Sequence, residues 1–319
     1  MLDVCLCTHN PRADILRLAV ESLTRQTVGP NAFRVLVVDN ASSPAVSGNI
    51  LVPLQAAGIA ARIVREMRLG IARARLRAIE ETGEEWLLFV DDDNELSPDY
   101  IEEGLKFISA RGEVGCFGGK LLLPTYYEHP AWTAAFLPYL GIKDAGDGAI
   151  IGKSLEWGNW EPPTAGAFIR RCLLKEYQTR SVSHSKVFRL GRKGSNGLAS
   201  HEDALIMRGA FRLGLSNAYH PGLVLYHHLD RNRFKLIYLL RLLYNYGAGA
   251  IILESILKGP RTCPRQYKNP AAFGVLMLRA FAGRAVRGDV RFALGTVAKH
   301  LGVRSEHLRQ SRKTKHGRK

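Results

Sequence analysis

The sequence contains few cysteines and no paired cysteine motif. Five of its 319 residues are cysteines, at positions 5, 7, 116, 172 and 263, and none forms a C-x-x-C pair. They fit neither a disulfide framework nor a zinc cluster, so we expect the chain to work in a reducing compartment. The segment after Met1 also lacks the basic start and apolar core of a signal peptide. We therefore expect a cytoplasmic protein.

Glycine-rich phosphate loops and uninterrupted apolar runs are missing as well. No G-x-G-x-x-G follows the first predicted strand and no G-x-x-x-x-G-K-[ST] occurs, which argues against a dinucleotide-dependent dehydrogenase and a P-loop enzyme. The apolar stretch 234–257 contains Arg241 and Glu254 and is interrupted by two glycines. A membrane-spanning helix needs about 20 mainly apolar residues with few charges. The stretch therefore predicts amphipathic or buried helices.

Acidic residues are scarce at the end of the chain. Residues 255–319 contain 16 Lys or Arg but only two acids, a net charge of +14, whereas residues 1–254 carry a net charge of +2. A cationic end of this kind usually meets phosphate, either on nucleic acid or on anionic lipid headgroups. For the last nine residues the alternative is a solvated tail without a partner.

Strand-like and helix-like segments alternate along the first 110 residues. Continuous apolar runs predict strands at 2–8, 33–38 and 85–90, and a weaker one at 62–65. Helical periodicity begins at residue 14 and recurs at 71–81 and 98–110. This alternation predicts a doubly wound, parallel α/β sheet, which binds ligands at the carboxyl ends of its strands.

Carboxylates follow two of these predicted strands. Asp39 follows the second strand, and Asp91, Asp92 and Asp93 follow the third. Three adjacent carboxylates repel one another unless a cation neutralises them. In an extended segment Asp91 and Asp93 point to one side while Asp92 faces elsewhere. Such oxygen ligands suit Mg²⁺ or Mn²⁺ completed by substrate phosphate; the alternative is a solvated turn, which Asp also favours.

Seven short motifs over residues 1–230 together resemble a known family. They are T-H-N-P at 8–11, V-V-D-N-A-S at 37–42, L-G-I-A-R-A-R at 69–75, D-D-D-N at 91–94, G-A-F-I-R-R at 166–171, H-E-D at 201–203, and Y-H-P at 219–221 leading to His227. In this order they resemble a family 2 glycosyltransferase with the GT-A fold.

The resemblance implies an α/β architecture of GT-A type. We expect a doubly wound, mixed but mainly parallel sheet flanked by helices, with a C-terminal helical extension. Residues 1–230 would form the catalytic domain, divided into a nucleotide-binding half (1–110) and an acceptor-side half (111–230). A helical extension (231–303) and a basic tail (304–319) would follow.

The resemblance also implies roles for single residues. The residues expected around the nucleotide are Thr8, Asn10, Pro11, Asp39, Arg75 and Asp92. The expected metal ligands are Asp91, Asp93 and His227, with His228 as the alternative to His227. Asp203 would be the catalytic base, with Glu202 as the alternative, because an acceptor hydroxyl needs a nearby carboxylate to take its proton. A divalent cation and Arg75 would stabilise the departing diphosphate.

These inferences define one expected activity. We predict a Mn²⁺- or Mg²⁺-dependent, inverting transferase that moves a sugar from a nucleotide-diphosphate sugar, with a UDP-sugar favoured, to a hydroxyl of a glycan or lipid-linked acceptor. The chain lacks a Q-x-x-R-W motif, so we expect one sugar per encounter. The loop 190–200, which has three glycines, predicts a lid over the diphosphate.

The expected location follows from the basic end, and two other functions compete with sugar transfer. We expect the chain on the inner face of the plasma membrane, where its basic end would meet an anionic membrane surface. One rival is a sugar nucleotidyltransferase, whose G-x-G-T-R loop is absent. The other is a nucleic-acid-binding protein that acts through its basic end, which leaves the aspartates 91–93 unexplained.

Overall fold

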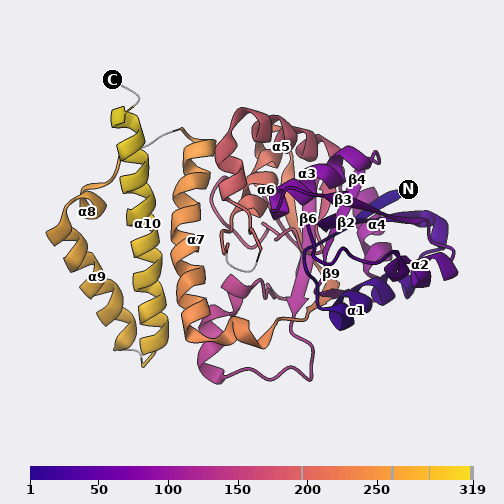
Figure 1. Ribbon diagram of the computed structural model, residues 1–319, viewed down its shortest axis with the longest axis horizontal. Coiled ribbons are helices and arrows are strands. Elements are labelled where there is room, and N and C mark those ends of the chain that lie inside the picture. Colours follow the sequence, from indigo (N-terminus) through magenta and orange to yellow (C-terminus); the bar gives the residue numbers. More distant parts are fainter. Residues whose placement is uncertain (195–196, 260–261, 287, 317–319) are drawn as a thin grey trace. The chain divides into compact units, whose positions relative to one another are not determined.

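The chain folds into two compact units. The computed structural model describes residues 1–194, 197–259, 262–286 and 288–316, with side chains as far as Arg312 (Figure 1). The first unit contains residues 1–127, 141–183 and 203–229; the second contains 128–140, 184–202 and the residues from 230 onward. Segments 128–140 and 184–202, which we expected in the catalytic domain, thus group with the C-terminal helices.

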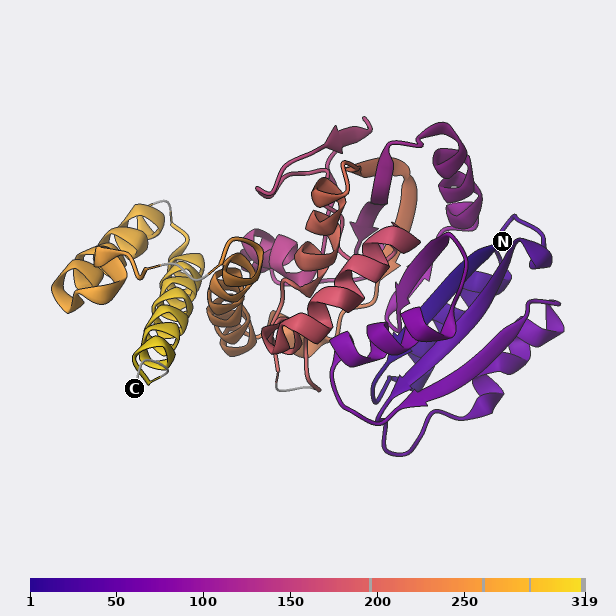
Figure 2. The same ribbon diagram turned by 90° about the horizontal axis from the view of Figure 1, so that it is seen from above.

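A nine-stranded mixed sheet forms the centre of the first unit (Figure 2). Its strands are β1 (Leu2–Thr8), β2 (Phe33–Asn40), β3 (Ala61–Glu66), β4 (Trp86–Asp91), β5 (Asn94–Leu96), β6 (Val114–Leu122), β7 (Ile150–Gly152), β8 (Phe168–Arg170) and β9 (Ser216–His227). The order is β3-β2-β1-β4-β8-β6-β9-β5, and β7 pairs with β9. Strands β1 to β4 run parallel, as do β6 and β9, whereas β5, β7 and β8 pair in antiparallel fashion. The expected mixed, mainly parallel sheet is confirmed.

Helices cover both faces of this sheet. They are α1 (Ala13–Thr24), α2 (Val52–Ala56), α3 (Ile71–Glu81), α4 (Tyr100–Ala110), α5 (Arg171–Ser183) and α6 (Glu202–Arg212). Short 3₁₀ segments lie at Pro30–Ala32, Gly48–Leu51, Ala131–Leu140, Ser185–Arg189 and Arg231–Phe234. Leu2, Val4 and Leu6 join the apolar cluster of α1, α2 and α4, whereas the Phe89 ring lies 5.9 Å from the Arg75 guanidinium of α3. Burial on both faces explains the continuous apolar runs of β1, β2 and β4.

The register of the parallel strands brings their carboxyl ends to one edge. Thr8 at the end of β1 lies opposite Asp39 of β2, and Cys7 lies opposite Asp91 of β4. Because side chains alternate along a strand, Asp91 points to the same face as Phe89, toward α3. The residues predicted to bind the nucleotide and the metal therefore meet at this edge.

Four helices make up most of the second unit: α7 (Leu236–Leu257), α8 (Arg265–Lys268), α9 (Pro270–Ala285) and α10 (Val290–His316). Among the described residues, α7 alone has the length and composition of a membrane span, but 39% of its most apolar window is buried. Its buried side chains include Leu239, Leu242 and Leu243. Residues 304–316 of the expected basic tail continue α10.

The expected lid at 190–200 belongs to the second unit. The backbones of Lys193 and Gly197 form an antiparallel bridge with N···O distances of 3.3 and 3.2 Å. Residues 195–196 lie outside the described residues. Leu190 and Leu198 are buried, so the ends of this segment are anchored, and its closure over a ligand stays a prediction.

Two glycines bring α7 and α10 into direct backbone contact. A Cβ atom at Gly247 would lie 2.0 Å from the Lys299 carbonyl oxygen, and one at Gly302 would lie 1.8 Å from the Tyr244 carbonyl oxygen. Both obstacles are helical backbone, which cannot give way as the end of a flexible side chain can. The packing of these two helices therefore requires that both positions lack a side chain.

This contact predicts opposite effects for one substitution at two glycines. Gly302→Ala should lower the free energy of unfolding by about 1–3 kcal/mol, the usual cost of overpacking. In α9 a Cβ at Gly274 would meet nothing within 4 Å. Gly274→Ala should therefore raise stability by about 0.5–1 kcal/mol, because alanine favours the helix. Urea unfolding of both variants measures this, and a Gly302→Ala protein as stable as wild type would contradict the close contact.

Candidate functional site

The loops that follow β1 and β2 are tied to each other. The backbone N–H of Asn10 donates to Ser42 Oγ at 2.9 Å, and the backbone N–H of Ser43 donates to Asn10 Oδ1 at 2.8 Å. Asn10 adopts a φ of +47°, a left-handed conformation that asparagine tolerates better than most residues. Asn10 and the adjacent Pro11 therefore sit in a loop of fixed shape beside the end of β1.

Asp39 organises the loop that follows its own strand. Its buried carboxylate accepts hydrogen bonds from the backbone N–H of Ser42 at 3.0 Å and of Val46 at 3.2 Å. Arg65 Nε lies 3.6 Å from Asp39 Oδ2. These contacts give Asp39 a positioning role in the free protein, and its expected contact with a nucleotide base stays a prediction.

Asp92 connects the ends of β1 and β4. The Thr8 hydroxyl donates to the Asp92 carboxylate, so two of the residues predicted around the nucleotide contact each other. The hydrogen bond holds the Asp92 side chain toward β1, as expected for a residue that does not share the metal with Asp91 and Asp93.

Asp93 and His227 lie together at the junction of β5 and β9. His227 Nε2 is 3.3 Å from Asp93 Oδ1, and the two residues are 7% and 9% exposed. The pairing of Asn94 with His227 across β5 and β9 fixes this contact, and His228 N–H donates to the Asp93 carbonyl at 2.8 Å. Residues 134 positions apart in the sequence thus become neighbours through sheet pairing.

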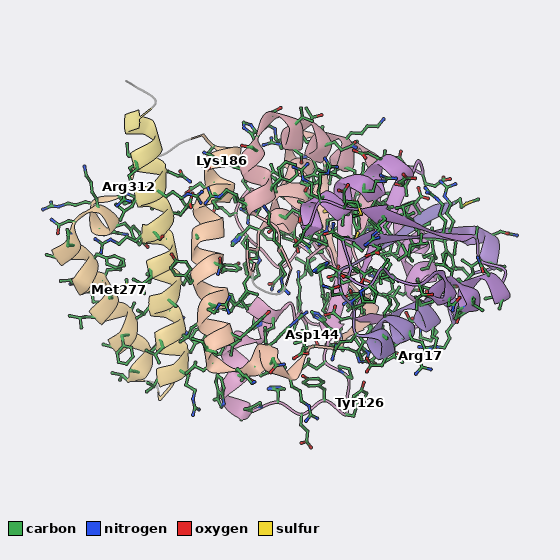
Figure 3. All side chains as sticks on the ribbon, viewed as in Figure 1. Arg17, Tyr126, Asp144, Lys186, Met277 and Arg312 are labelled. Carbon is green, nitrogen blue, oxygen red and sulfur yellow. The ribbon has the colours of Figure 1, made fainter. Side chains whose placement is uncertain are left out.

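The two neighbouring histidines face different groups. His228 Nδ1 lies 3.1 Å from the hydroxyl of Tyr126, which is labelled in Figure 3, and His228 Nε2 lies 2.9 Å from Glu95 Oε2. Both ring nitrogens of His228 therefore have partners away from Asp93. Of the two histidines that the sequence left open, His227 is the one that points at an expected metal ligand.

The chemistry of these residues fits a divalent cation. His227 Nδ1 is buried and has no hydrogen-bond partner among the described residues, so the ring makes its polar contact through Nε2. Carboxylate oxygens and an imidazole nitrogen suit Mn²⁺, with remaining positions filled by phosphate or water. Within the described part of the chain no group of three His, Cys, Asp or Glu side chains is already arranged to hold a metal. Asp91, Asp93 and His227 are the residues that would hold such a cation.

Asp91 lies in the same charged environment. Burial is the main reason why its pKa lies above the ordinary value; Asp93 and Asp203 raise the pKa further, while Arg75 and His227 oppose them. A cation bound by Asp91 and Asp93 would remove this repulsion.

Arg75 and Thr164 hold the carboxylate of Asp203. Arg75, buried on α3, places Nη1 3.3 Å from Asp203 Oδ1 and donates from Nη2 to the Thr164 hydroxyl. The backbone N–H of Thr164 donates to Asp203 Oδ2 at 3.3 Å. The surrounding protein displaces part of the water around the Asp203 carboxylate, which alone would raise its pKa, but Arg75 and the Thr164 N–H outweigh this effect, so the pKa lies below its ordinary value. Asp203 is therefore ionised at neutral pH.

Exposure separates the two acids that could act as a base. The side chain of Asp203 is 38% exposed, whereas Glu202, the first residue of α6, is 1% exposed. Only an accessible carboxylate can reach the proton of a bound acceptor. The geometry thus favours Asp203 over Glu202.

Thr164 is the functional residue that the sequence did not predict. It lies in the Pro- and Gly-rich stretch before β8, where periodicity is absent. Tyr126 and Glu95, which contact His228, were missed because each contact joins residues more than 100 positions apart in the sequence. No local pattern marks such partners.

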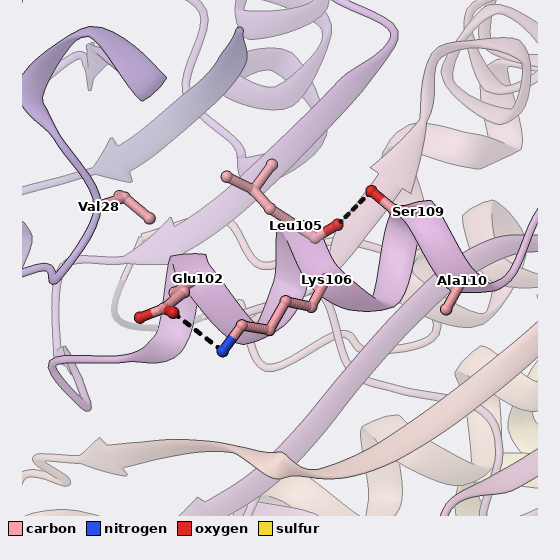
Figure 4. A pocket seen from close by; sticks show the side chains of 6 residues that line it. All are labelled: Val28, Glu102, Leu105, Lys106, Ser109 and Ala110. Carbon is pink, nitrogen blue, oxygen red and sulfur yellow. Dashed lines mark hydrogen bonds and ion pairs between the residues drawn. The ribbon is translucent and has the colours of Figure 1, made fainter.

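A separate hollow lies along α4 (Figure 4). It is lined by Val28, Glu102, Leu105, Lys106, Ser109 and Ala110. The polar side chains that line the hollow contact other lining residues: Lys106 Nζ lies 2.9 Å from Glu102 Oε1, and Ser109 Oγ donates to the Leu105 carbonyl at 3.0 Å. The residues predicted from the sequence do not line it, and we assign it no function.

Comparison with known proteins identifies the family of this arrangement. The family described as Glycosyl transferase family 2 matches residues 3–177. The chain belongs to this family. A stretch of 109 residues is 32% identical to an uncharacterized glycosyltransferase of Haemophilus influenzae, covering 34% of each protein. The chain therefore matches about a third of that relative's length.

Solved glycosyltransferases share the fold over nearly the whole chain. The similarity to the S. aureus TarS 1-349 structure extends over 97% of this chain and 91% of the TarS chain, with a TM-score of 0.50 and 16% sequence identity. The mannosyltransferase PcManGT from Pyrobaculum calidifontis, in complex with GDP-Man and Mn²⁺, covers 96% and 86%, with a TM-score of 0.56 and 15% identity. At these identities the similarity shows the fold alone. The expected GT-A architecture and glycosyltransferase family are confirmed.

The different surroundings of His227 and His228 predict different effects on metal binding. His227→Phe keeps a ring but removes the nitrogen that faces Asp93, so it should weaken Mn²⁺ binding in the presence of UDP by at least about tenfold. The matched variant His228→Phe should change this affinity by less than about threefold, because both nitrogens of His228 point elsewhere. Titration calorimetry with Mn²⁺ measures both values, and equal affinities in the two variants would show that His227 is not a ligand.

Proposed function

We propose that this family 2 chain transfers one sugar from a nucleotide-diphosphate sugar to a hydroxyl of a glycan or lipid-linked acceptor, with a divalent cation and inversion at the anomeric carbon. The observation that carries the proposal is the ionised, accessible carboxylate of Asp203, which Arg75 and Thr164 hold in place. This carboxylate lies close enough to Asp91 to raise the pKa of Asp91. A base and diphosphate-binding groups in one place are what such a transfer needs.

The donor is proposed from the site and from the structural neighbours. TarS 1-349 has been solved in complex with UDP, and PcManGT with GDP-Man and Mn²⁺. In this chain the loops that carry Thr8, Asn10, Pro11, Asp39 and Asp92 would enclose the nucleotide. Asp91, Asp93 and His227 would hold Mn²⁺ or Mg²⁺, which neutralises charge on the diphosphate when bound. We favour a UDP-sugar as donor.

The proposed role of Asp203 follows from its charge and its supports. An acceptor hydroxyl would attack the anomeric carbon as its proton passes to an Asp203 oxygen, while the bond from that carbon to the diphosphate oxygen breaks. The nucleotide diphosphate leaves with the bonding electrons, and Arg75 would stabilise the negative charge that develops on it. Attack from the side opposite the leaving group inverts the configuration. The Thr164 N–H keeps the carboxylate oriented throughout.

A cytoplasmic location belongs to the same proposal. Nucleotide sugars are made in the cytosol, and all five cysteines of the chain are free thiols in the structure. This supports a reducing compartment.

A panel of donors tests the proposed activity. Incubation with UDP-, GDP- and dTDP-sugars should give Mn²⁺-dependent release of one nucleoside diphosphate, and Asp203→Asn should cut kcat by about 10²–10⁴-fold. Asn keeps the shape of the side chain, so donor binding should stay within a few-fold of wild type. An Asp203→Asn variant that turns over at nearly the wild-type rate would contradict the role of Asp203 as base. If no donor in the panel releases a nucleoside diphosphate, the proposed activity is wrong.

The ion pair between Arg75 and Asp203 predicts a shift in the pH profile. In wild type the pKa of Asp203 is lowered, so protonation of the base should limit kcat/KM only at a pH below the ordinary range of an aspartate. Arg75→Met removes the cation that stabilises the Asp203 carboxylate. The partial loss of hydration at this carboxylate remains, and it raises the pKa of Asp203. The acid limb should therefore move to higher pH, in addition to any loss of rate.

Arg77→Met is the matched control for this prediction. Arg77 lies on the same helix but pairs with Glu81 at 2.7 Å. This variant should keep the wild-type acid limb in rates measured between about pH 3 and 8. An unchanged limb in Arg75→Met would contradict the assignment of Asp203 as the titrating base.

A further inference from the structure

Helix α9 has an apolar stripe on its solvent-exposed side. Ala271, Val275, Leu278, Ala282 and Val286 recur at helical spacing along and just beyond α9, and all five are exposed. Leu278 is 72% exposed and Val286 is 87% exposed. Isolated exposed apolar residues are common, but a continuous stripe along one helix face marks an interaction surface.

The opposite side of α9 is already packed. Phe273 is buried beside Tyr267 of α8, with ring centroids 6.1 Å apart, and the Arg304 guanidinium of α10 lies 4.3 Å from the Phe273 ring. Figures 1 and 2 show α9 beside α10, with no other helix of the second unit on its far side. The core of the second unit therefore does not explain why the outer stripe is apolar.

Cationic residues accompany the stripe. Arg279 lies on α9 beside the stripe, and Arg265 and Lys268 lie on α8; all three are exposed, and neither helix contains an acid. Arg284 of α9 instead lies on the packed side, where its guanidinium is 4.8 Å from the Phe292 ring of α10. Figure 3 shows the side chains of these helices, with Met277 of α9 labelled. A partner of this surface must therefore offer both apolar material and negative charge.

The two acids of residues 255–319 do not offset these cations. Glu306 is 4% exposed and bonds to Arg189 of the same unit, with Oε2 2.5 Å from Nη2. Asp289 accepts a hydrogen bond from the Phe292 N–H at the start of α10. Both carboxylates are thus committed to internal contacts.

We propose that α9 lies flat on an anionic lipid bilayer. The stripe would enter the boundary between headgroups and acyl chains, while Arg279 and the two cations of α8 contact lipid phosphates. Nucleic acid would satisfy the cations but leave the stripe in water, because its outer surface is charged phosphate. The combination of apolar stripe and cations therefore favours the bilayer.

Membrane binding of this kind is separate from sugar transfer. It uses none of the residues placed in the proposed active site, and a protein that fails to bind vesicles can still release nucleoside diphosphate. For an enzyme that uses cytosolic nucleotide sugars, the surface concerned would be the inner face of the plasma membrane, a step that rests on the proposed function.

Sedimentation with vesicles tests the proposal on the full chain. Wild type should pellet at low salt with phosphatidylcholine vesicles that contain phosphatidylglycerol, and stay in the supernatant with phosphatidylcholine alone. Leu278→Asp should lower the affinity at least about fivefold, because a charge placed in the stripe cannot enter the acyl boundary. The matched variant Leu213→Asp, an exposed position at the end of α6, should bind as wild type.

Three outcomes would overturn the proposal. The first is wild type that stays in the supernatant with anionic vesicles at low salt. The second is equal binding of Leu278→Asp and wild type to anionic vesicles, which would show that charge alone makes the contact. Binding to DNA or RNA without binding to vesicles would assign the surface to nucleic acid. Thermal melts of both variants verify folding. In a Leu278→Trp variant, brominated lipid should quench the added tryptophan fluorescence if the stripe inserts.

Discussion

Charge balance at the carboxyl edge of the sheet is the constraint on which the rest of the first unit depends. The parallel register of β1, β2 and β4 brings Asp39 and Asp91 to one edge, and sheet pairing brings Asp93 beside His227. Carboxylates so close together repel one another, and burial makes the repulsion stronger. The charge state of each one therefore depends on the groups that surround it.

The groups that surround these carboxylates differ, and each carboxylate therefore has a different role. Asp39 bonds to backbone N–H groups of its own loop and stabilises that loop's shape. Asp203 has a buried guanidinium beside it and stays ionised. Asp91 also lies near Arg75 and His227, but burial and the carboxylates of Asp93 and Asp203 keep its pKa above the ordinary value. On the proposed function, the free protein would keep its base ionised, while the metal site would be completed by the substrate's own phosphates.

Much of this arrangement could be predicted from the sequence, because the first half of the chain obeys local rules. Strand 2–8 and helix 71–81 have the expected boundaries, since a strand buried on both faces is a continuous apolar run and an amphipathic helix repeats every 3.6 residues. Strands β6 and β9 were missed. β6 contains two adjacent glycines and β9 a proline, and their register shifts, so neither shows the regular pattern of a strand.

The site was less predictable from the residues themselves. The acidic ends of two strands were visible, but the roles of His227 and Asp203 came from resemblance to a family. Their supports, Thr164 for Asp203 and the partners that turn His228 away from Asp93, depend on contacts between distant segments. Such contacts form only when the sheet is complete, so short-range sequence patterns carry no record of them.

The glycine contacts between α7 and α10 have a consequence for how this chain can change in evolution. Gly247 faces the backbone at Lys299, and Gly302 faces the backbone at Tyr244. One residue inserted into either helix between its two contact positions would rotate the following turn by about 100° and put a side chain against backbone. Insertions and deletions should therefore be excluded from these stretches of the two helices, while the connections between the helices remain free to vary in length among relatives.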